Sequence, residues 1–361
     1  MNIFEFRNSL VGDYASYVRS FIRIRDEKID RVVTETLEQG RLWPQPLLQL
    51  NPNFEPGSLI DELVASGKLH ETCGGIFRIG KTEEDPVGSG LRLHHHQDRA
   101  IDIARDGHPY VVTTGTGSGK SLTYIIPIID HVLRRGSGKG IQAIIVYPMN
   151  ALANSQEGEL QKFLDLGFPE GPPVTYRRYT GQEGVDARNE IIADPPDILL
   201  TNYVMLELLL TRPHEKKLIE AAQGLRYLVF DEIHTYRGRQ GADVAMLIRR
   251  ARERFGGDGI QCVGTSATMS SGGSLDDQQR VVADVTSRIF GVNVRPEHIV
   301  GETLRRVTPH VDFETQEART QLRSAVEDVG NLSGATYDDF VVSPLASWIE
   351  THFGIDLDSD G

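Results

Sequence analysis

The segment TTGTGSGKS, residues 113–121, decides how this chain of 361 residues is organised. It follows a run of β-branched residues and precedes an apolar stretch with helical spacing, so it predicts a strand, a tight loop and a helix. The glycines of the loop allow several backbone N–H groups to converge on one anion. Lys120 adds a positive charge, and Ser121 adds a hydroxyl that can ligate Mg²⁺. The segment therefore predicts a loop that grips the phosphates of a nucleotide, in a variant form that has Thr114 where the strict pattern has glycine.

Two later segments place further polar residues at strand ends. LRYLVFDEIH, residues 225–234, is an apolar strand pattern that ends in Asp231 and Glu232. Asp231 is expected to hold Mg²⁺, and Glu232 is expected to orient or deprotonate the water that attacks the γ-phosphate. A third strand pattern, QCVGTSATM at residues 261–269, ends in a run of hydroxyl residues.

Strand and helix patterns alternate through the middle of the chain. Each polar motif follows directly after a strand pattern, as in PYVVTT, IQAIIVYP, DILLTN, YLVFDE and QCVGTSAT. This alternation predicts an α/β fold, in which helices cover both faces of a parallel sheet and ligands bind at the carboxyl ends of the strands.

These segments, in this order and spacing, resemble motifs I, II and III of the superfamily 2 helicases, in the DEXH group. The resemblance covers about residues 91–299, and it implies a RecA-like P-loop domain with a central, mostly parallel sheet. The run DEIHTYRGRQGADVAMLIRR, residues 231–250, is most similar to the YprA-like branch of large bacterial DNA helicases, which act in DNA repair or phage defence.

The resemblance also implies roles for single residues. Gln97, in LHHHQDRAI, would read the adenine edge. His234 would bond to Ser266 and Thr268 and so couple the nucleotide state to the grip on the strand. The residues expected to face nucleic acid are Pro148, Asn150, Gly181, Thr201 and Asn202. Those expected to contact ATP, besides Gln97, are Thr116, Gly117, Ser118, Gly119, Lys120 and Ser121, with Ser121 and Asp231 as Mg²⁺ ligands.

Three regions are expected along the chain: a helical accessory domain over residues 1–86, the ATP-binding domain over residues 87–299, and an acidic connecting segment over residues 300–361. Such helicases complete the ATP site with arginines from a second RecA-like domain. No arginine-rich motif of that kind follows residue 269, so we expect that domain elsewhere in a longer chain. The isolated chain is then expected to hydrolyse ATP poorly.

The net charge of −13 does not favour a nucleic-acid partner at first. Most of the excess lies after residue 312, and a nearly neutral motor can grip a strand with amides and hydroxyls. Cys73 and Cys262 lack metal or disulfide spacing and are expected to be reduced core residues. No signal peptide or long apolar run is present, which predicts a soluble, cytoplasmic protein.

Other residues have two interpretations. His94, His95 and His96 are neighbours without a metal-spaced partner, so a metal site is not favoured. The arginines of residues 249–254 fit a solvated helix face better than a DNA contact, whereas Arg177 and Arg178 are stronger candidates for contacting DNA. The function also has alternatives: a translocase on duplex DNA, an RNA helicase, or a non-catalytic ATP-binding switch. Both Lys120 and Glu232 are present, which argues against the switch.

Overall fold

The computed structural model describes residues 3–21, 24–38, 53–115, 117–267, 274–328 and 336–354. These residues fall into two compact units. One consists of Asn53–His310 with Gly334–Ser343 and contains the large sheet; we call it the sheet unit. The other draws on Met1–Pro52, Val311–Ser333 and Pro344–Gly361, and we call it the helical unit.

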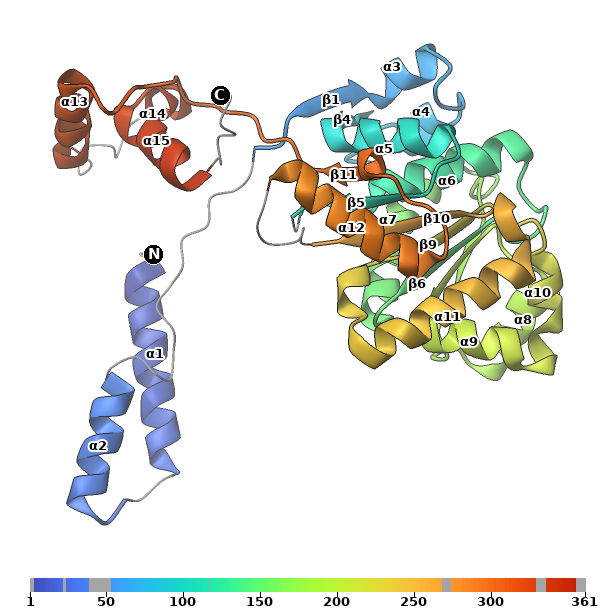
Figure 1. Ribbon diagram of the computed structural model, residues 1–361, viewed down its shortest axis with the longest axis horizontal. Helices are drawn as coiled ribbons and strands as arrows, with labels where there is room; N and C mark the ends of the chain where they lie inside the picture. The colour runs from blue at the N-terminus through green and yellow to red at the C-terminus, as the bar shows by residue number, and fades with distance from the viewer. Residues whose placement is uncertain are drawn as a thin grey trace. The chain divides into compact units, whose positions relative to one another are not determined.

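The sheet unit is built on seven parallel strands, with the order β11-β5-β10-β9-β6-β8-β7 (Figure 1). The predicted α/β, RecA-like fold is confirmed. Five of the strands, β5, β6, β8, β9 and β11, are short runs dominated by Val, Ile, Leu, Phe and Tyr, as expected where both faces are covered. The strands are β5 (Tyr110–Thr113), β6 (Ala143–Tyr147), β7 (Tyr176–Tyr179), β8 (Ile198–Asn202), β9 (Tyr227–Phe230), β10 (Gln261–Ser266) and β11 (Ile299–Gly301).

Two layers of helices bury the two faces of this sheet. Val111 and Val112 are neighbours on β5, yet Val111 packs in one apolar cluster and Val112 in the other, because successive strand residues point to opposite faces. One layer contains α5 (His95–Arg105), α6 (Leu122–Arg135) and α7 (Asn150–Leu164). The other contains α8 (Val185–Ala193), α9 (Tyr203–Thr211), α10 (Lys216–Ala221), α11 (Gly238–Phe255) and α12 (Leu275–Phe290).

The segment before the P-loop also belongs to the sheet unit. β1 (Pro56–Leu59) pairs with β4 (Arg92–His94), and β2 (Arg78–Ile79) pairs with β3 (Ser89–Gly90). The backbone of residues 53–55 bonds to that of residues 303–305, with Glu55 N–H donating to Thr303 O at 2.8 Å. The compact unit therefore spans residues 53–310, whereas the sequence pattern placed its limits at residues 87 and 299. Two short helices lie between these strands, α3 (Ile60–Ala65) and α4 (Cys73–Ile76).

The helical unit contains α1 (Ile3–Ser20), α2 (Glu27–Glu38), α13 (Gln316–Glu327), α15 (Pro344–Ile349) and the π-helical turn Glu350–Gly354. The apolar stripe of α1 and α2 is largely exposed: Tyr14 by 42%, Ile29 by 57% and Val32 by 62%. The short helix α14 (Tyr337–Val341) is grouped with the sheet unit.

Cys73 and Cys262 are both free and buried, as expected from their spacing. Burial raises the pKa of each thiol to about 12. Within the residues described, no helix has the length and apolar character needed to cross a membrane.

Candidate active site

The glycine-rich loop connects β5 to α6 at the carboxyl edge of the sheet. Gly117 and Gly119 adopt positive φ values of 83° and 72°, which residues with a Cβ rarely reach. The buried hydroxyls of Thr114 and Ser118 lie 2.6 Å apart and close the loop on itself. Thr116, one of the predicted ATP contacts, lies outside the described residues.

The start of α5 holds this loop through two adjacent side chains. His96 Nε2 lies 2.9 Å from the carbonyl of Ser118, and Gln97 Nε2 donates to the carbonyl of Gly119 at 2.9 Å. Burial lowers the pKa of His96 to about 4, so the ring is neutral and donates its Nε2 hydrogen. Gln97 Oε1 accepts from the backbone of His94 at 2.8 Å. Both ends of the Gln97 amide are therefore engaged within the protein.

Sequence reasoning missed two residues around this loop. His96 appeared only as one of three neighbouring histidines, and nothing in the sequence distinguishes its buried position from those of its neighbours. Glu302 follows β11 and accepts from the N–H of Gly115 at 2.7 Å. Its position is set by the pairing of β11 with β5, which places Gly301 opposite Thr113. Only knowledge of the strand order would have revealed it.

Asp231 and Glu232 lie just beyond β9, the strand that pairs directly with β10. Thr265 on β10 joins the two residues, since its Oγ1 donates to Asp231 Oδ1 at 2.6 Å and accepts from the Glu232 N–H at 2.9 Å. Burial raises the pKa of Asp231 to about 6, and the nearby Glu232 adds to the effect, while Thr265 and Lys120 oppose it. Asp231 is thus a partly buried carboxylate that lacks a full counter-charge, which suits a divalent cation.

Glu232 connects the two halves of the site. Its Oε1 lies 3.2 Å from Lys120 Nζ, so the P-loop and the DEIH segment meet although 112 residues separate them. Among the described residues, Glu232 is the only one other than glycine with positive φ, at 51°. Such a backbone costs about 1–2 kcal/mol for a residue with a side chain, and it is found mainly where function requires it.

His234 lies between Glu232 and the end of β10. Its Nδ1 is 3.1 Å from Glu232 Oε2, 3.3 Å from the Ala267 backbone N and 3.4 Å from Ser266 Oγ. The predicted proximity of His234 to Ser266 is therefore present. Thr268, the other predicted coupling residue, lies outside the described residues.

The residues predicted to face nucleic acid lie at the ends of β6, β7 and β8, and most of them bond to groups within the protein. Asn202 Nδ2 donates to Asn150 Oδ1 at 2.6 Å and to Thr180 O at 3.0 Å, while its Oδ1 caps α9. The buried Thr201 hydroxyl donates to Tyr179 O at 2.6 Å. Gly181 has a φ of 90°, and its N–H donates to Glu183. Pro148, which follows β6 directly, is half-buried.

The two arginines before this block also have internal partners. Arg178 forms ion pairs with Glu157 at 3.2 Å and with Glu183 at 2.9 Å. Arg177 donates to the carbonyl of Tyr176. Within the part of the chain that the structure describes, no group of three or more His, Cys, Asp or Glu side chains is placed to hold a metal ion by itself.

Comparison with known proteins identifies the family. A family model described as DEAD/DEAH box helicase matches residues 94–274, half of the chain. Druantia protein DruE from Escherichia coli is 26% identical over 77% of this chain and 21% of its own length. The uncharacterized ATP-dependent helicase YprA from Bacillus subtilis is 32% identical over 52% of this chain and 24% of its own length.

A solved structure shares the fold. The DUF1998 helicase MrfA bound to DNA and AMPPNP is similar with a TM-score of 0.53 and 20% identity, covering 84% of this chain and 41% of that one. The chain thus spans about a fifth to a quarter of the curated relatives named above. The matched region contains the P-loop, the DEIH segment and Ser266, and the chain belongs to the DEAD/DEAH box helicases of superfamily 2, on their YprA-like branch.

Proposed function

We propose that this chain is the first motor domain of an ATP-dependent DNA helicase or translocase. The observation that carries the proposal is the contact between Lys120 and Glu232, with Thr265 holding Glu232 and Asp231 in place. A cation for phosphate, a partly buried carboxylate for Mg²⁺ and a second carboxylate for water meet at one sheet edge. That set performs ATP hydrolysis, which is the activity of ATP-dependent helicases.

Each residue has a separate task in this proposal. The loop N–H groups and Lys120 bind the phosphates of ATP. Asp231 and Ser121 would hold Mg²⁺, which neutralises charge on the phosphates when bound. Glu232 accepts a proton from the attacking water. For this step, its carboxylate must exchange the Lys120 contact for water, and the phosphates give Lys120 a new partner.

His234 is proposed to couple the nucleotide state of this site to the end of β10. Its Nδ1 can accept from the Ala267 N–H or, in the tautomer that carries its hydrogen on Nδ1, donate to the Glu232 carboxylate. A change at Glu232 therefore alters the bonding of the segment that follows Ser266.

A second RecA-like domain is proposed to complete the site. Within the described ranges, the contacts of the Asp231 and Glu232 carboxylates involve Lys120, Thr265 and His234, and they include no arginine. An arginine supplied to a phosphoryl-transfer site raises turnover by about 10³- to 10⁵-fold. Residues 1–361 alone are therefore expected to bind ATP weakly and to hydrolyse it slowly.

DNA is proposed as the partner because the similar helicase MrfA binds DNA in its solved structure. The test measures ATP hydrolysis by residues 1–361 with no nucleic acid, single-stranded DNA, duplex DNA or RNA. The same series is then run on this chain extended by a second RecA-like domain. The Lys120→Ala form of each protein serves as the blank.

We expect low hydrolysis from the short form and strong stimulation of the extended form by single-stranded DNA. Stimulation by duplex DNA without strand separation would assign a translocase, and stimulation by RNA alone would assign an RNA helicase. If the extended chain binds ATP but does not hydrolyse it with any of the nucleic acids, the proposal is overturned and the chain is a non-catalytic ATP-binding switch.

A further inference from the structure

Two buried tyrosines lie next to the proposed Mg²⁺ ligands, and neither has a task in the hydrolysis described above. Tyr124 is on α6 and Tyr147 ends β6, and both side chains are fully buried in the same apolar cluster. Neither phenol oxygen forms a hydrogen bond with the residues that the structure describes. A buried hydroxyl without a partner costs free energy that phenylalanine at the same position would not cost, so each hydroxyl calls for an explanation.

The strand register places Tyr147 beside Asp231. β6 and β9 are parallel neighbours with Val146 opposite Phe230, and the Asp231 N–H donates to the Val146 carbonyl at 2.9 Å. The residues that follow this pair are Tyr147 and Asp231. Tyr147 packs in the cluster on the α6 side of the sheet, and so does Val229, two residues before Asp231. Burial raises the pKa of Tyr147, and the nearby Asp231 carboxylate adds to the effect.

Helix spacing places Tyr124 beside Ser121. The two residues are three positions apart and share one side of the helix, and a long helical side chain points back over the preceding turn. Burial raises the pKa of Tyr124, Asp231 and Tyr147 raise it further, and Ser121 lowers it, so all three groups are close to the phenol. In the described chain, none of them meets the Tyr124 hydroxyl in a hydrogen bond of normal length and angle.

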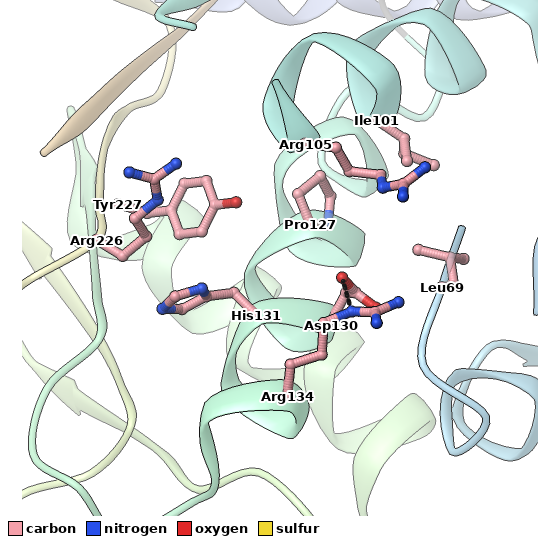
Figure 2. Close-up of a pocket in the computed structure, with 9 residues that line it drawn as sticks. All are labelled: Leu69, Ile101, Arg105, Pro127, Asp130, His131, Arg134, Arg226 and Tyr227. Carbon is pink, nitrogen blue, oxygen red and sulfur yellow. Dashed lines mark hydrogen bonds and ion pairs between the residues drawn. The ribbon is translucent and has the colours of Figure 1, made fainter. Parts of the chain in front are cut away.

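Asp231 has a carboxylate oxygen that is open to a further bond. Its Oδ1 accepts from Thr265, whereas no described residue donates to Oδ2. Asp130, further along α6, shows a carboxylate that the protein satisfies alone (Figure 2). The N–H of His70 donates to Asp130 Oδ1 at 2.6 Å, and Arg134 Nε lies 3.0 and 2.9 Å from its two oxygens. The two phenols and Asp231 are thus neighbours whose hydrogen bonds are not all made.

We propose that Tyr124 and Tyr147 are positioning residues that hold the two Mg²⁺ ligands in place. In the Mg²⁺-bound form, the Ser121 hydroxyl donates to Tyr124, and the Tyr124 hydroxyl donates to Tyr147. The Tyr147 hydroxyl donates to Asp231, which can only accept. This direction leaves the lone pairs of the Ser121 oxygen free for the ion. These roles depend on the proposed function, in which Ser121 and Asp231 hold Mg²⁺.

Such support matters for Mg²⁺ in particular, because this ion requires ligands in near-ideal octahedral positions. Groups that bond to the ligands of a metal fix the orientation of those ligands, and loss of one such group usually weakens metal affinity by about 10- to 100-fold. The two phenols would supply one bond to each protein ligand. Phenylalanine fills nearly the same space but cannot supply it.

The test removes each hydroxyl, with Tyr124→Phe and Tyr147→Phe in residues 1–361. The dissociation constant of ATP is measured in EDTA and in Mg²⁺, and the ratio of the two values gives the contribution of the ion. We expect this ratio to fall by about tenfold in each variant, with the affinity in EDTA unchanged. Tyr227→Phe is the matched control and should leave the ratio unchanged. Tyr227 is also buried and lies on β9, four residues before Asp231, but it lines the pocket of Figure 2.

Thermal unfolding of the nucleotide-free variants separates positioning from packing. Removal of a buried hydroxyl that has no partner should leave the melting temperature unchanged or raise it. A lower melting temperature would show that the hydroxyl is already bonded in the free chain, and it would overturn the proposal. An unchanged ratio in either variant would overturn it too. If the unmodified chain binds ATP equally in EDTA and in Mg²⁺, the assignment of Ser121 and Asp231 as Mg²⁺ ligands fails as well, so the two failures are distinguishable.

Discussion

Two groups of polar residues lie at the same edge of the sheet, and they differ in what their side chains bond to. Lys120, Asp231 and Glu232 have charged groups that are only partly matched within the protein. Thr201 instead donates its hydroxyl to Tyr179. Asn202 bonds to Asn150 and Thr180 and caps α9. The charged groups of the first group keep capacity for a further partner, whereas the side chains of the second group bond mainly within the protein.

This difference matters for interpreting motifs. A sequence motif marks residues that the fold or the chemistry requires, but it does not say which of the two requires them. The hydrogen bonds of each side chain distinguish residues that the fold requires from residues that the chemistry requires. Substitutions in the first group should alter catalysis, and substitutions in the second should alter stability as well as binding.

The largest expected effect is the loss of turnover in Glu232→Gln. The amide cannot accept a proton from water, so hydrolysis in a form joined to its second domain should fall by about 10²- to 10⁴-fold, the usual contribution of a general base. ATP binding should persist, whereas Lys120→Ala should weaken it. Steady-state hydrolysis and nucleotide titrations measure both. Full turnover by Glu232→Gln would remove Glu232 from the catalytic group.

Asp231 should make the stability of the nucleotide-free chain depend on pH. Its pKa is about 6 in the folded chain and 3.8 in its ordinary state, so between these values the folded state holds a proton that the unfolded state releases. Stability should therefore fall as the pH rises from about 4 to 6, by up to about 3 kcal/mol. Asp231→Asn should remove this slope and stabilise the chain at pH 7.5.

Denaturant unfolding at several pH values measures the slope. The exposed Asp284→Asn is a suitable control, because Asp284 lies on α12 away from the site. An unchanged slope in Asp231→Asn would mean that the carboxylate is already ionised at low pH in the folded chain.

Asn202 tests whether the second group serves both fold and binding. Asn202→Ala removes the cap of α9 and the bonds to Asn150 and Thr180, and it should lower the free energy of unfolding by about 2 kcal/mol. Asn202→Asp retains a capping oxygen but sets its second carboxylate oxygen against Asn150 Oδ1 and Thr180 O, so it should cost at least as much stability, and its charge should repel nucleic acid. Unfolding curves beside DNA titrations separate the two roles. Weaker DNA binding by Asn202→Ala at unchanged stability would place Asn202 in the first group.

The smallest effect is expected for base choice at Gln97. If its amide reads adenine, ATP should bind better than GTP by about tenfold or less, the value of one hydrogen bond, and Gln97→Ala should erase the preference. His96→Ala is the matched control, since it also releases the P-loop but leaves the amide in place. Equal affinities for ATP and GTP in the unmodified chain would leave Gln97 with its structural contacts alone.

Much of the sheet unit is predictable from sequence because its signals are local. Strand patterns such as that of β9 end directly at polar motifs, and this is enough to place Lys120 and Asp231 at the carboxyl edge of the sheet. The limits of the unit were not predictable in this way. Residues 53–55 belong to the sheet unit through backbone hydrogen bonds to residues 303–305, and no local sequence pattern predicts such a pairing.

The candidate site was predictable where chemistry restricts residue type and not where backbone groups are the targets. Lys120 and Glu232 are recognisable because few other side chains can perform their tasks. His96 and Glu302 bond to the backbone of residues 118 and 115, which many side chains can do. Tyr124 and Tyr147 likewise come from separate elements, so their place beside Asp231 becomes visible only after folding.

The bonds from α5 to the P-loop also determine which way its peptide planes face. In a trans peptide the C=O and the following N–H point in opposite directions, and no cis peptide is present in the described residues. His96 and Gln97 draw the carbonyls of Ser118 and Gly119 toward α5, so the N–H groups of Gly119 and Lys120 face away from it. The loop thus has its donors oriented before any phosphate arrives. Less of the free energy of nucleotide binding is then lost to ordering the loop, because α5 has already restricted its conformations.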